Sequence, residues 1–282
     1  MAEWRVSMKK YGIVVDVAKC TGCYACFLAC KDENCGEEHP GYTAAQPMTG
    51  QFWLNITEVE RGAFPKVKLS HIPKLCGHCD NPGCALMADN GAVYKRDDGI
   101  VIIDPDKAAG QKQIVNTCPN RMIFWNEEKQ VAQKCDMCAH FLDRGFAKPR
   151  CVEMCPTGAL TFGDLSDPDS EIVRVIAEKK PYELHPEYGL NGNVLYLNVP
   201  KKFVTGTVIY EETDQCAEDV KVTLKADGVE LHTETDVFGD FWFDGLEGRA
   251  DYSLKIEADG YKAIDLAVKT LNDVDLGEIF LV

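Results

Sequence analysis

The chain has 282 residues, 14 of them cysteine, and a formal net charge of −15 at neutral pH. This length favours two domains over one, and an acidic chain without a basic stripe is not expected to bind nucleic acid. No stretch approaches the roughly 18 apolar residues of a membrane-spanning helix, so no membrane span is predicted. Residues 200–282 contain 8 Lys/Arg and 19 Asp/Glu, which is −11 of the net charge, whereas thirteen cysteines lie between residues 20 and 155. This break near Pro200 predicts a domain boundary.

The first twenty residues do not resemble a secretion signal, because Asp16 interrupts their short apolar patch. A cysteine-rich chain without such a signal indicates metal or redox chemistry rather than a disulfide scaffold. The run GIVVDV at 12–17 predicts a buried strand that leads into the first cysteine motif.

The first motif, CTGCYACFLAC, has the C-x2-C-x2-C-x3-C spacing of ferredoxins. In that arrangement three close cysteines bind one [4Fe–4S] cluster and the fourth binds another. Each of the four irons needs one thiolate, so the fourth ligand of this site must come from elsewhere in the chain. The cysteines of the motif are Cys20, Cys23, Cys26 and Cys30.

The middle of the chain combines predicted strands with an incomplete motif. Alternating apolar residues predict a strand at 52–60 (FWLNITEVE) and a β-hairpin at 90–104 (NGAVYKRDDGIVIID) that covers a cluster. The run CGHCDNPGC offers three ligands, but Ala88 stands where a fourth would fall. These three ligands are Cys76, Cys79 and Cys84.

An isolated cysteine, Cys118, precedes a proline, as the last cysteine of an iron–sulfur motif usually does. Ferredoxin spacing places Ile114, Gln111 and Ala108 at the positions of its partners, and none of them is a ligand. The last motif, KCDMCAHFLDRGFAKPRCVEMCP, has a stretched interior but an intact C-x3-C-P ending. Its cysteines are Cys135, Cys138, Cys151 and Cys155.

Exchange of fourth ligands between the motifs uses these twelve cysteines and completes three [4Fe–4S] sites. The first site comprises Cys20, Cys23, Cys26 and Cys155. The second site comprises Cys30, Cys135, Cys138 and Cys151. The third site comprises Cys76, Cys79, Cys84 and Cys118. A fourth position, defined by Ala88, Ala108, Gln111 and Ile114, has lost all its ligands.

Other residues near the motifs receive plainer interpretations. His78 could be a ligand, but an imidazole that is solvated or lies behind the ligands is preferred because cysteines already fill the coordination. Tyr24 and Trp125 are interpreted as packing aromatics rather than electron relays. Cys35 and Cys216 remain outside the sites and are interpreted as structural or surface thiols. A zinc-organised adaptor is the alternative from another class of protein, although zinc sites use pairs of closely spaced ligands instead of a four-cysteine run.

Beyond the motifs, DSEIVRVIAEKK at 169–180 predicts an amphipathic helix with an N-cap at Asp169 or Ser170. GLNGNVLYLNVP up to Pro200 is interpreted as an extended arm. From residue 201 the apolar residues alternate, and about seven short strands separated by Asp-Gly or Gly-Asp turns predict a small β-sandwich. Acidic runs such as EETD (211–214) are interpreted as solvated loops, because the spacing of a calcium loop is absent.

Four cysteine motifs in this order resemble the iron–sulfur subunits of the dimethyl-sulfoxide-reductase family of molybdopterin enzymes, over residues 11–199. The resemblance implies an α+β fold with two interlocked ferredoxin-like modules over 1–164, the inner one at about 65–130. It also implies that the helix and arm at 165–200 dock on a partner subunit. TDVFGDFWFDGL resembles transthyretin-like, carboxypeptidase-regulatory-like domains, so 201–282 is expected to be such a seven-stranded β-sandwich.

The resemblance implies an electron-transfer subunit with three [4Fe–4S] clusters and no catalytic residue. Its partner in a heterodimer would be a large catalytic subunit that carries molybdenum bis-molybdopterin guanine dinucleotide. The absent fourth site, the stretches NGAVYKRDDGIVIIDPDKAAG and FWNEEKQVAQKCDMCAHFLD, and the extra C-terminal domain resemble cytoplasmic transhydroxylases of polyhydroxylated benzenes. Two alternatives stay open: the subunit of another reductase (arsenate, sulfur compound or catechol dehydroxylase), and a free-standing polyferredoxin.

Overall fold

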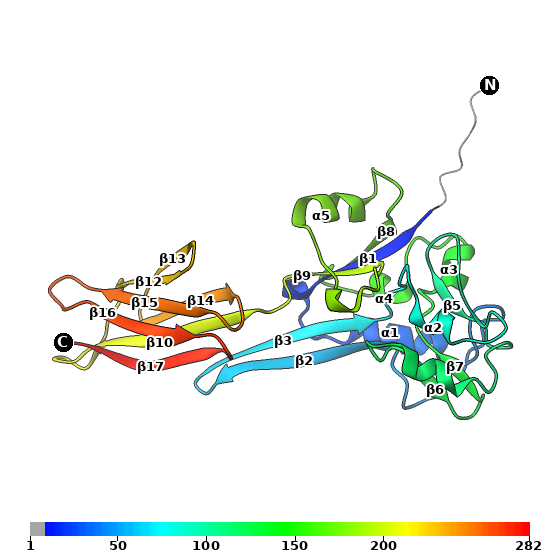
Figure 1. Ribbon diagram of the computed structural model, residues 1–282, viewed down its shortest axis with the longest axis horizontal. Coiled ribbons are helices and arrows are strands. Elements are labelled where there is room, and N and C mark those ends of the chain that lie inside the picture. The colour runs from blue at the N-terminus through cyan, green and yellow to red at the C-terminus, as the bar shows by residue number, and fades with distance from the viewer. Residues whose placement is uncertain (1–8) are drawn as a thin grey trace, which may run out of the picture. The chain divides into compact units, whose positions relative to one another are not determined.

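The computed structural model describes residues 9–282, which form two compact units (Figure 1). Unit 1 consists of the residues up to Glu58 together with Ser70–Val199. Unit 2 consists of Val59–Leu69 together with Pro200–Val282. The sequence indicates a break near Pro200, but it does not indicate that Val59–Leu69 belongs with the C-terminal residues. No helix in the described residues is long and apolar enough to cross a membrane.

A three-stranded sheet forms the frame of unit 1. Its central strand, β1 (Tyr11–Asp16), pairs antiparallel with β8 (Leu160–Asp164) and parallel with β9 (Val194–Leu197). Helix α5 (Glu171–Lys179) lies beside this sheet (Figure 1). Its Ile172 is fully buried in a cluster with Val14 of β1 and Leu197 of β9. The strand predicted at 12–17 and the helix predicted at 169–180 are therefore confirmed, with Ser170 as the helix N-cap.

The interpretation of the segment before Pro200 as an extended arm is wrong for β9. Val15 of β1 pairs with Tyr196 of β9, and Tyr196 also exchanges two backbone hydrogen bonds with Tyr182. Backbone N–H and C=O groups need hydrogen-bond partners. Those of β9 find them in β1 and Tyr182, so β9 is the third strand of the sheet.

The rest of unit 1 is built from short elements around the cysteine motifs. The hairpin predicted at 90–104 is confirmed as β4 (Val93–Lys95) and β5 (Val101–Ile103), and a second hairpin pairs β6 (Phe124–Asn126) with β7 (Val131–Gln133). The other helices are α1 (Ala25–Asn34), α2 (Gly83–Leu86), α3 (Ala139–Asp143) and α4 (Arg150–Glu153), with 3-10 turns at Val17–Lys19, Lys112–Thr117 and Pro186–Tyr188.

A long hairpin runs through both units. The strand predicted at 52–60 is confirmed as β2 (Leu54–Ala63), and it pairs with β3 (Lys66–Leu75), which no sequence pattern predicted. The tip of this hairpin, Val59–Leu69, is part of unit 2.

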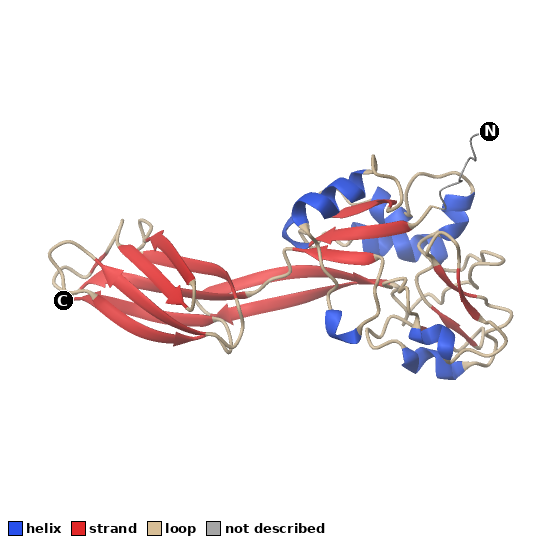
Figure 2. Cartoon of the chain, turned by 45° about the horizontal axis from the view of Figure 1, so that its top comes forward, coloured by secondary structure: helices blue, strands red, loops and turns tan. Residues whose placement is uncertain are grey.

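Unit 2 contains two four-stranded sheets that share one hydrophobic core. Figure 2 shows this part of the chain as strands and loops. The first sheet contains β10 (Lys202–Tyr210), β11 (Gln215–Cys216), β14 (Asp240–Leu246) and β17 (Val274–Leu281). The second contains β12 (Lys221–Ala226), β13 (Val229–Glu234), β15 (Asp251–Glu257) and β16 (Ile264–Lys269). The seven predicted strands are present, and the two-residue β11 is an eighth.

The hairpin tip is held in unit 2 by basic side chains. Arg61 forms an ion pair with Asp273 at 3.6 Å, and its guanidinium lies 5.5 Å from the ring centre of Phe203. Lys68 lies 4.3 Å from the ring centre of Trp242. Further ion pairs join Lys66 to Asp240 and Lys68 to Asp244. Cations over aromatic faces with carboxylates beside them fix the tip without a large apolar surface.

Candidate metal centres

The structure brings Cys155 to the cysteines of the first motif. Its thiol interacts electrostatically with those of Cys20 and Cys26, more than a hundred residues away in sequence. Helix α1 carries Cys26, and Cys155 follows α4, so the contact between these two helices places the four predicted ligands of the first site together.

The second site contains the fourth cysteine of the first motif. Cys30 lies one helical turn beyond Cys26 on α1, and it interacts electrostatically with Cys135, Cys138 and Cys151. The four thiols are buried. The juxtaposition agrees with the crossed assignment, in which each outer motif gives its last cysteine to the other site.

The isolated Cys118 lies with the three cysteines of the second motif. Cys76, Cys79, Cys84 and Cys118 line a single cavity. Cys118 interacts electrostatically with Cys76, Cys79 and Cys84, and its sulfur accepts the backbone N–H of Met122 at 3.5 Å. The third predicted ligand set is thus assembled in space.

The three sites follow one another through unit 1. Cys26 of the first site interacts with Cys151 of the second, and Cys76 of the third interacts with Cys135 of the second. The second site therefore lies between the other two. Because cysteines of neighbouring sites interact, clusters bound in this row of three sites would suit stepwise electron transfer.

Tight left-handed turns shape the cysteine loops. Gly22, Tyr24, His78, Met137 and Cys138 have positive φ angles between 45° and 68°. Such turns direct successive backbone N–H groups toward one point, where an anion can be bound. Several sulfurs accept such a bond: the N–H of Met137 lies 3.3 Å from the sulfur of Cys135, and the N–H of Leu54 bonds Cys30.

Burial makes several of these thiols poor acids in the absence of metal. It raises the pKa of Cys26 and Cys84 to about 11, and that of Cys30 and Cys79 to about 12. Metal ligation requires thiolates, so bound iron must supply the positive charge that keeps them deprotonated.

All fourteen cysteines lie within the described residues, and all are free. Four thiols per site and directed N–H groups fit a [4Fe–4S] cluster at each of the three sites. The second site is buried, whereas Cys23 of the first site is exposed. A bound cluster would supply one-electron transfer, and the chain would supply its ligands, its hydrogen bonds and its exclusion of water.

Cys155 has an unusually polar environment. Burial raises its pKa, but hydrogen bonds from Thr157, Leu160 and Ala159 outweigh burial and lower the pKa overall. The hydroxyl of Thr157 lies 3.7 Å from the sulfur.

Replacing Thr157 with valine is expected to lower the reduction potential of the cluster at the first site. The hydrogen bond that this substitution removes stabilises the more negative, reduced cluster by about 1 kcal/mol more than the oxidised cluster. Its loss changes the ratio of reduced to oxidised cluster roughly fivefold. Redox titration followed by electron paramagnetic resonance measures the change. Thr161→Val on β8 is the matched control, and equal shifts in both variants would contradict a specific bond.

The fourth position is filled by protein. Ala88, Ala108 and Ile114 belong to one apolar cluster, in which Ala108 and Ile114 are fully buried. Gln111 lies beside it, where its side chain accepts the N–H of Asp89 at 2.8 Å and donates to the carbonyl oxygen of Lys107 at 2.8 Å. These four residues therefore close the space with side chains.

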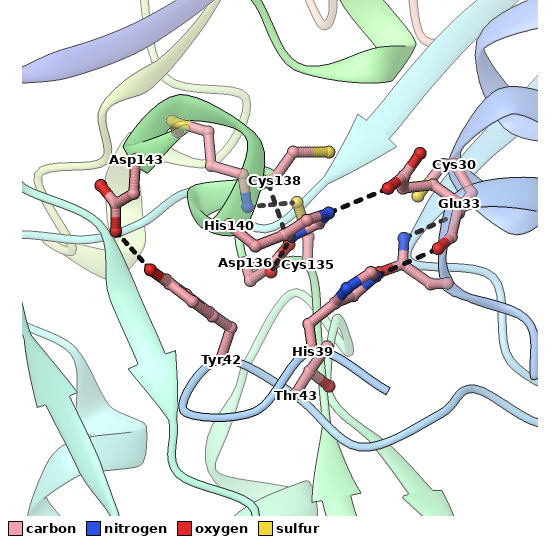
Figure 3. Close-up of polar contacts among 12 residues, drawn as sticks. Cys30, Glu33, His39, Tyr42, Thr43, Cys135, Asp136, Cys138, His140 and Asp143 are labelled. Atoms are coloured by element: carbon pink, nitrogen blue, oxygen red, sulfur yellow. Dashed lines mark hydrogen bonds and ion pairs between the residues drawn. The ribbon is translucent and has the colours of Figure 1, made fainter. Parts of the chain in front are cut away.

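A buried polar network adjoins the second site, and no sequence motif indicated it. Figure 3 shows His140 between Glu33 and Asp136, beside Cys135 and Cys138. Its Nε2 lies 3.0 Å from a Glu33 oxygen and its Nδ1 lies 3.4 Å from an Asp136 oxygen. Asp136 also accepts the N–H of Cys138 at 2.9 Å. The network thus supports the loop that carries two predicted ligands.

Glu33, His39 and His140 lie close enough to suggest a metal site of their own. The two imidazole rings, however, are stacked 3.6 Å apart and nearly parallel, at 9°. His39 Nε2 lies 3.1 Å from the carbonyl oxygen of Glu33, and both nitrogens of His140 have carboxylate partners. This geometry is that of a hydrogen-bond network.

Sequence and structure differ on His78. The ring is completely buried, so the interpretation as a solvated imidazole is wrong. Burial, together with Lys134 and Lys95, lowers its pKa well below the usual value, and its Nδ1 accepts the N–H of Val101 at 3.1 Å. His78 lies between Cys76 and Cys79 in the chain, and its role as an imidazole beside the ligands rather than a ligand stays a prediction.

The other singled-out residues have ordinary surroundings. The hydroxyl of Tyr24 donates to Glu58 at 2.6 Å, and Trp125 packs against the apolar cluster at the fourth position. The sulfur of Cys35 lies 3.7 Å from that of Met48, and Cys216 is exposed.

Converging sets of four cysteines on tight loops define an iron–sulfur electron-transfer protein. Comparison with known proteins agrees. Residues 67–165 match the family described as 4Fe-4S dicluster domain, and residues 204–276 match the carboxypeptidase regulatory-like domain.

Three relatives extend the comparison. The pyrogallol hydroxytransferase small subunit of Pelobacter acidigallici is 41% identical over 97% of this chain and 100% of its own length. A tetrathionate reductase subunit of Salmonella typhimurium is 35% identical over 70% of this chain and 75% of its own. The arsenate respiratory reductase iron–sulfur subunit of Shewanella sp. is 30% identical over 67% and 96%. The chain belongs to this family of iron–sulfur subunits of molybdopterin enzymes.

Proposed function

We propose that this chain is the electron-transfer subunit of a heterodimeric molybdopterin transhydroxylase that acts on polyhydroxylated benzenes of the pyrogallol type. One observation carries the proposal: similarity to the small subunit of pyrogallol hydroxytransferase continues through both domains, over 97% of the chain. The filled fourth position supports a chain with three clusters.

The cysteines of the three sites would hold [4Fe–4S] clusters in a row. Molybdenum bis-molybdopterin guanine dinucleotide and the substrate would be bound by the large partner subunit, so no residue of this chain touches substrate. A transhydroxylation with a tetrahydroxybenzene co-substrate consumes no net electrons. The clusters would therefore set the redox state of the catalytic subunit. The cytoplasm is the expected compartment.

A second candidate is the subunit of a reductase in the same family. It is favoured by the similarity of the cluster-binding part to subunits of tetrathionate reductase and arsenate respiratory reductase. In that case the row of sites would carry electrons from an external donor to the partner.

Activity of the native complex separates the two candidates. A tag on this chain is used to purify it anaerobically with its partner, and the complex is given pyrogallol with a catalytic amount of tetrahydroxybenzene. We expect phloroglucinol to form without consumption of a reductant. Oxidation of reduced viologen by arsenate or tetrathionate, with no reaction of pyrogallol, would support the reductase instead. Reading of the gene beside this one is an independent check on the partner.

A further inference from the structure

Lys134 is a lysine whose side chain is buried inside unit 1. It follows β7 directly, precedes Cys135, and is only 3% exposed. Its ammonium donates hydrogen bonds to the carbonyl oxygen of Val101 and, at 3.0 Å, to that of Cys135. Both acceptors are neutral, so they solvate the charge without cancelling it. Burial of an ammonium group requires compensation from nearby negative charge.

Two ligand sets and one carboxylate residue adjoin Lys134. Its ammonium bonds the carbonyl oxygen of Cys135, Asp136 is two positions further along the chain, and Cys76 and Cys84 line the same cavity as Lys134. Cys76 and Cys84 belong to the third site, and Cys135 belongs to the second. Lys134 also lines the cavity that the four cysteines of the third site enclose.

We propose that Lys134 is a counter-ion shared by the clusters of the second and third sites, and that its fixed charge raises the reduction potentials of both. This inference rests on the proposed function, since it requires clusters at these sites. Reduction adds negative charge to a cluster, and a cation held nearby in a medium of low dielectric stabilises the reduced form.

The first site provides an internal reference. None of its cysteines lines the cavity that Lys134 shares with the third site, and the bond of Lys134 to the carbonyl oxygen of Cys135 lies at the second site. The ammonium therefore acts unequally along the row and favours electrons on the second and third clusters over the first. In the native complex this arrangement holds reducing equivalents within the row.

Lys95 offers a matched comparison. Its ammonium also approaches the third site, where it donates to the carbonyl oxygen of Cys79 at 2.9 Å. It is, however, paired with Asp80 at 2.6 Å, and its side chain is 26% exposed. Pairing and solvent both screen its charge, so its influence on the clusters should be much smaller.

The test uses three substitutions in the tagged native complex. Lys134→Met removes charge and hydrogen bonds, Lys134→Gln removes the charge but keeps donors, and Lys134→Arg keeps the charge. Iron content is measured first, and each cluster is then titrated by potentiometry followed by electron paramagnetic resonance. At a fixed potential we expect Met and Gln to lower the reduced-to-oxidised ratio of the second and third clusters about tenfold, which is about 59 mV for a one-electron centre.

In the same measurements the first cluster should not move, Lys134→Arg should stay near the unmodified protein, and Lys95→Met should shift the third cluster much less. Unchanged potentials in fully loaded Lys134→Met and Lys134→Gln, or equal shifts at all three clusters, would overturn the inference.

If Lys134→Met and Lys134→Gln fail to bind iron, the iron content of Lys134→Arg distinguishes a required charge from a packing role. Iron restored by arginine supports a required positive charge, whereas loss in all three variants would assign Lys134 a packing role and overturn the inference. An unmodified complex without three clusters would instead refute the proposed function.

Discussion

Replacing Cys118 with alanine is expected to lower the iron content of anaerobically purified protein from about twelve atoms to about eleven. The substitution leaves Cys76, Cys79 and Cys84 as a three-cysteine site, which loses its unligated iron and becomes a [3Fe–4S] centre. The oxidised protein should then show a new paramagnetic signal. The other two clusters should keep their spectra, because Cys118 lines the cavity of the third site.

Gln111→Leu is the control for this substitution. Gln111 is the polar member of the fourth position, and its loss removes bonds to Asp89 and Lys107. It should therefore reduce stability by about 1–3 kcal/mol while iron stays near twelve. An iron content near sixteen, or a Cys118→Ala protein with unchanged spectra, would show that the motifs have been paired wrongly.

Replacing Cys30 with alanine is expected to damage the cluster of a motif more than a hundred residues away. Cys30 follows Cys26 on α1, yet its sulfur lies among Cys135, Cys138 and Cys151. The second cluster should convert or be lost, which removes between about one and four of about twelve iron atoms. The signal of the first cluster should persist.

Cys35→Ala is the control for Cys30→Ala, because Cys35 lies at the end of α1 and is not a predicted ligand. The thiol of Cys35 contacts Met48, and its removal should leave iron content and spectra unchanged. Damage confined to the first cluster in Cys30→Ala would refute the crossed ligand assignment.

The cysteine loops could be predicted from the sequence because cluster ligands need fixed local spacing. A tight turn must present the sulfurs of Cys20, Cys23 and Cys26 to one point, and that demand is visible in the chain. Strands of the C-terminal domain were equally visible, because the alternation of VKVTLK or YSLKIE follows directly from one buried face. Both the cysteine spacing and the strand alternation arise from residues that are close together in the sequence.

Long-range pairing was not visible in this way. The strand β9 is four residues long, and its partner β1 lies about 180 residues earlier, so a short apolar run looked like an arm. Glu33 and His140 meet across 107 residues of sequence. No sequence pattern singles out Lys134, because only the folded chain shows that it lies beside two ligand sets.

The β2–β3 hairpin limits how the C-terminal domain can be separated from the rest of the protein. A gene truncated after Val199 would remove Asp240, Asp244 and Asp273 but leave Arg61, Lys66 and Lys68 on an orphaned tip. Clean excision must also cut out Val59–Leu69 and join Glu58 to Ser70 by a short turn. Conversely, a graft of this domain onto another iron–sulfur subunit has to carry two pieces of sequence, because the domain is discontinuous in the gene.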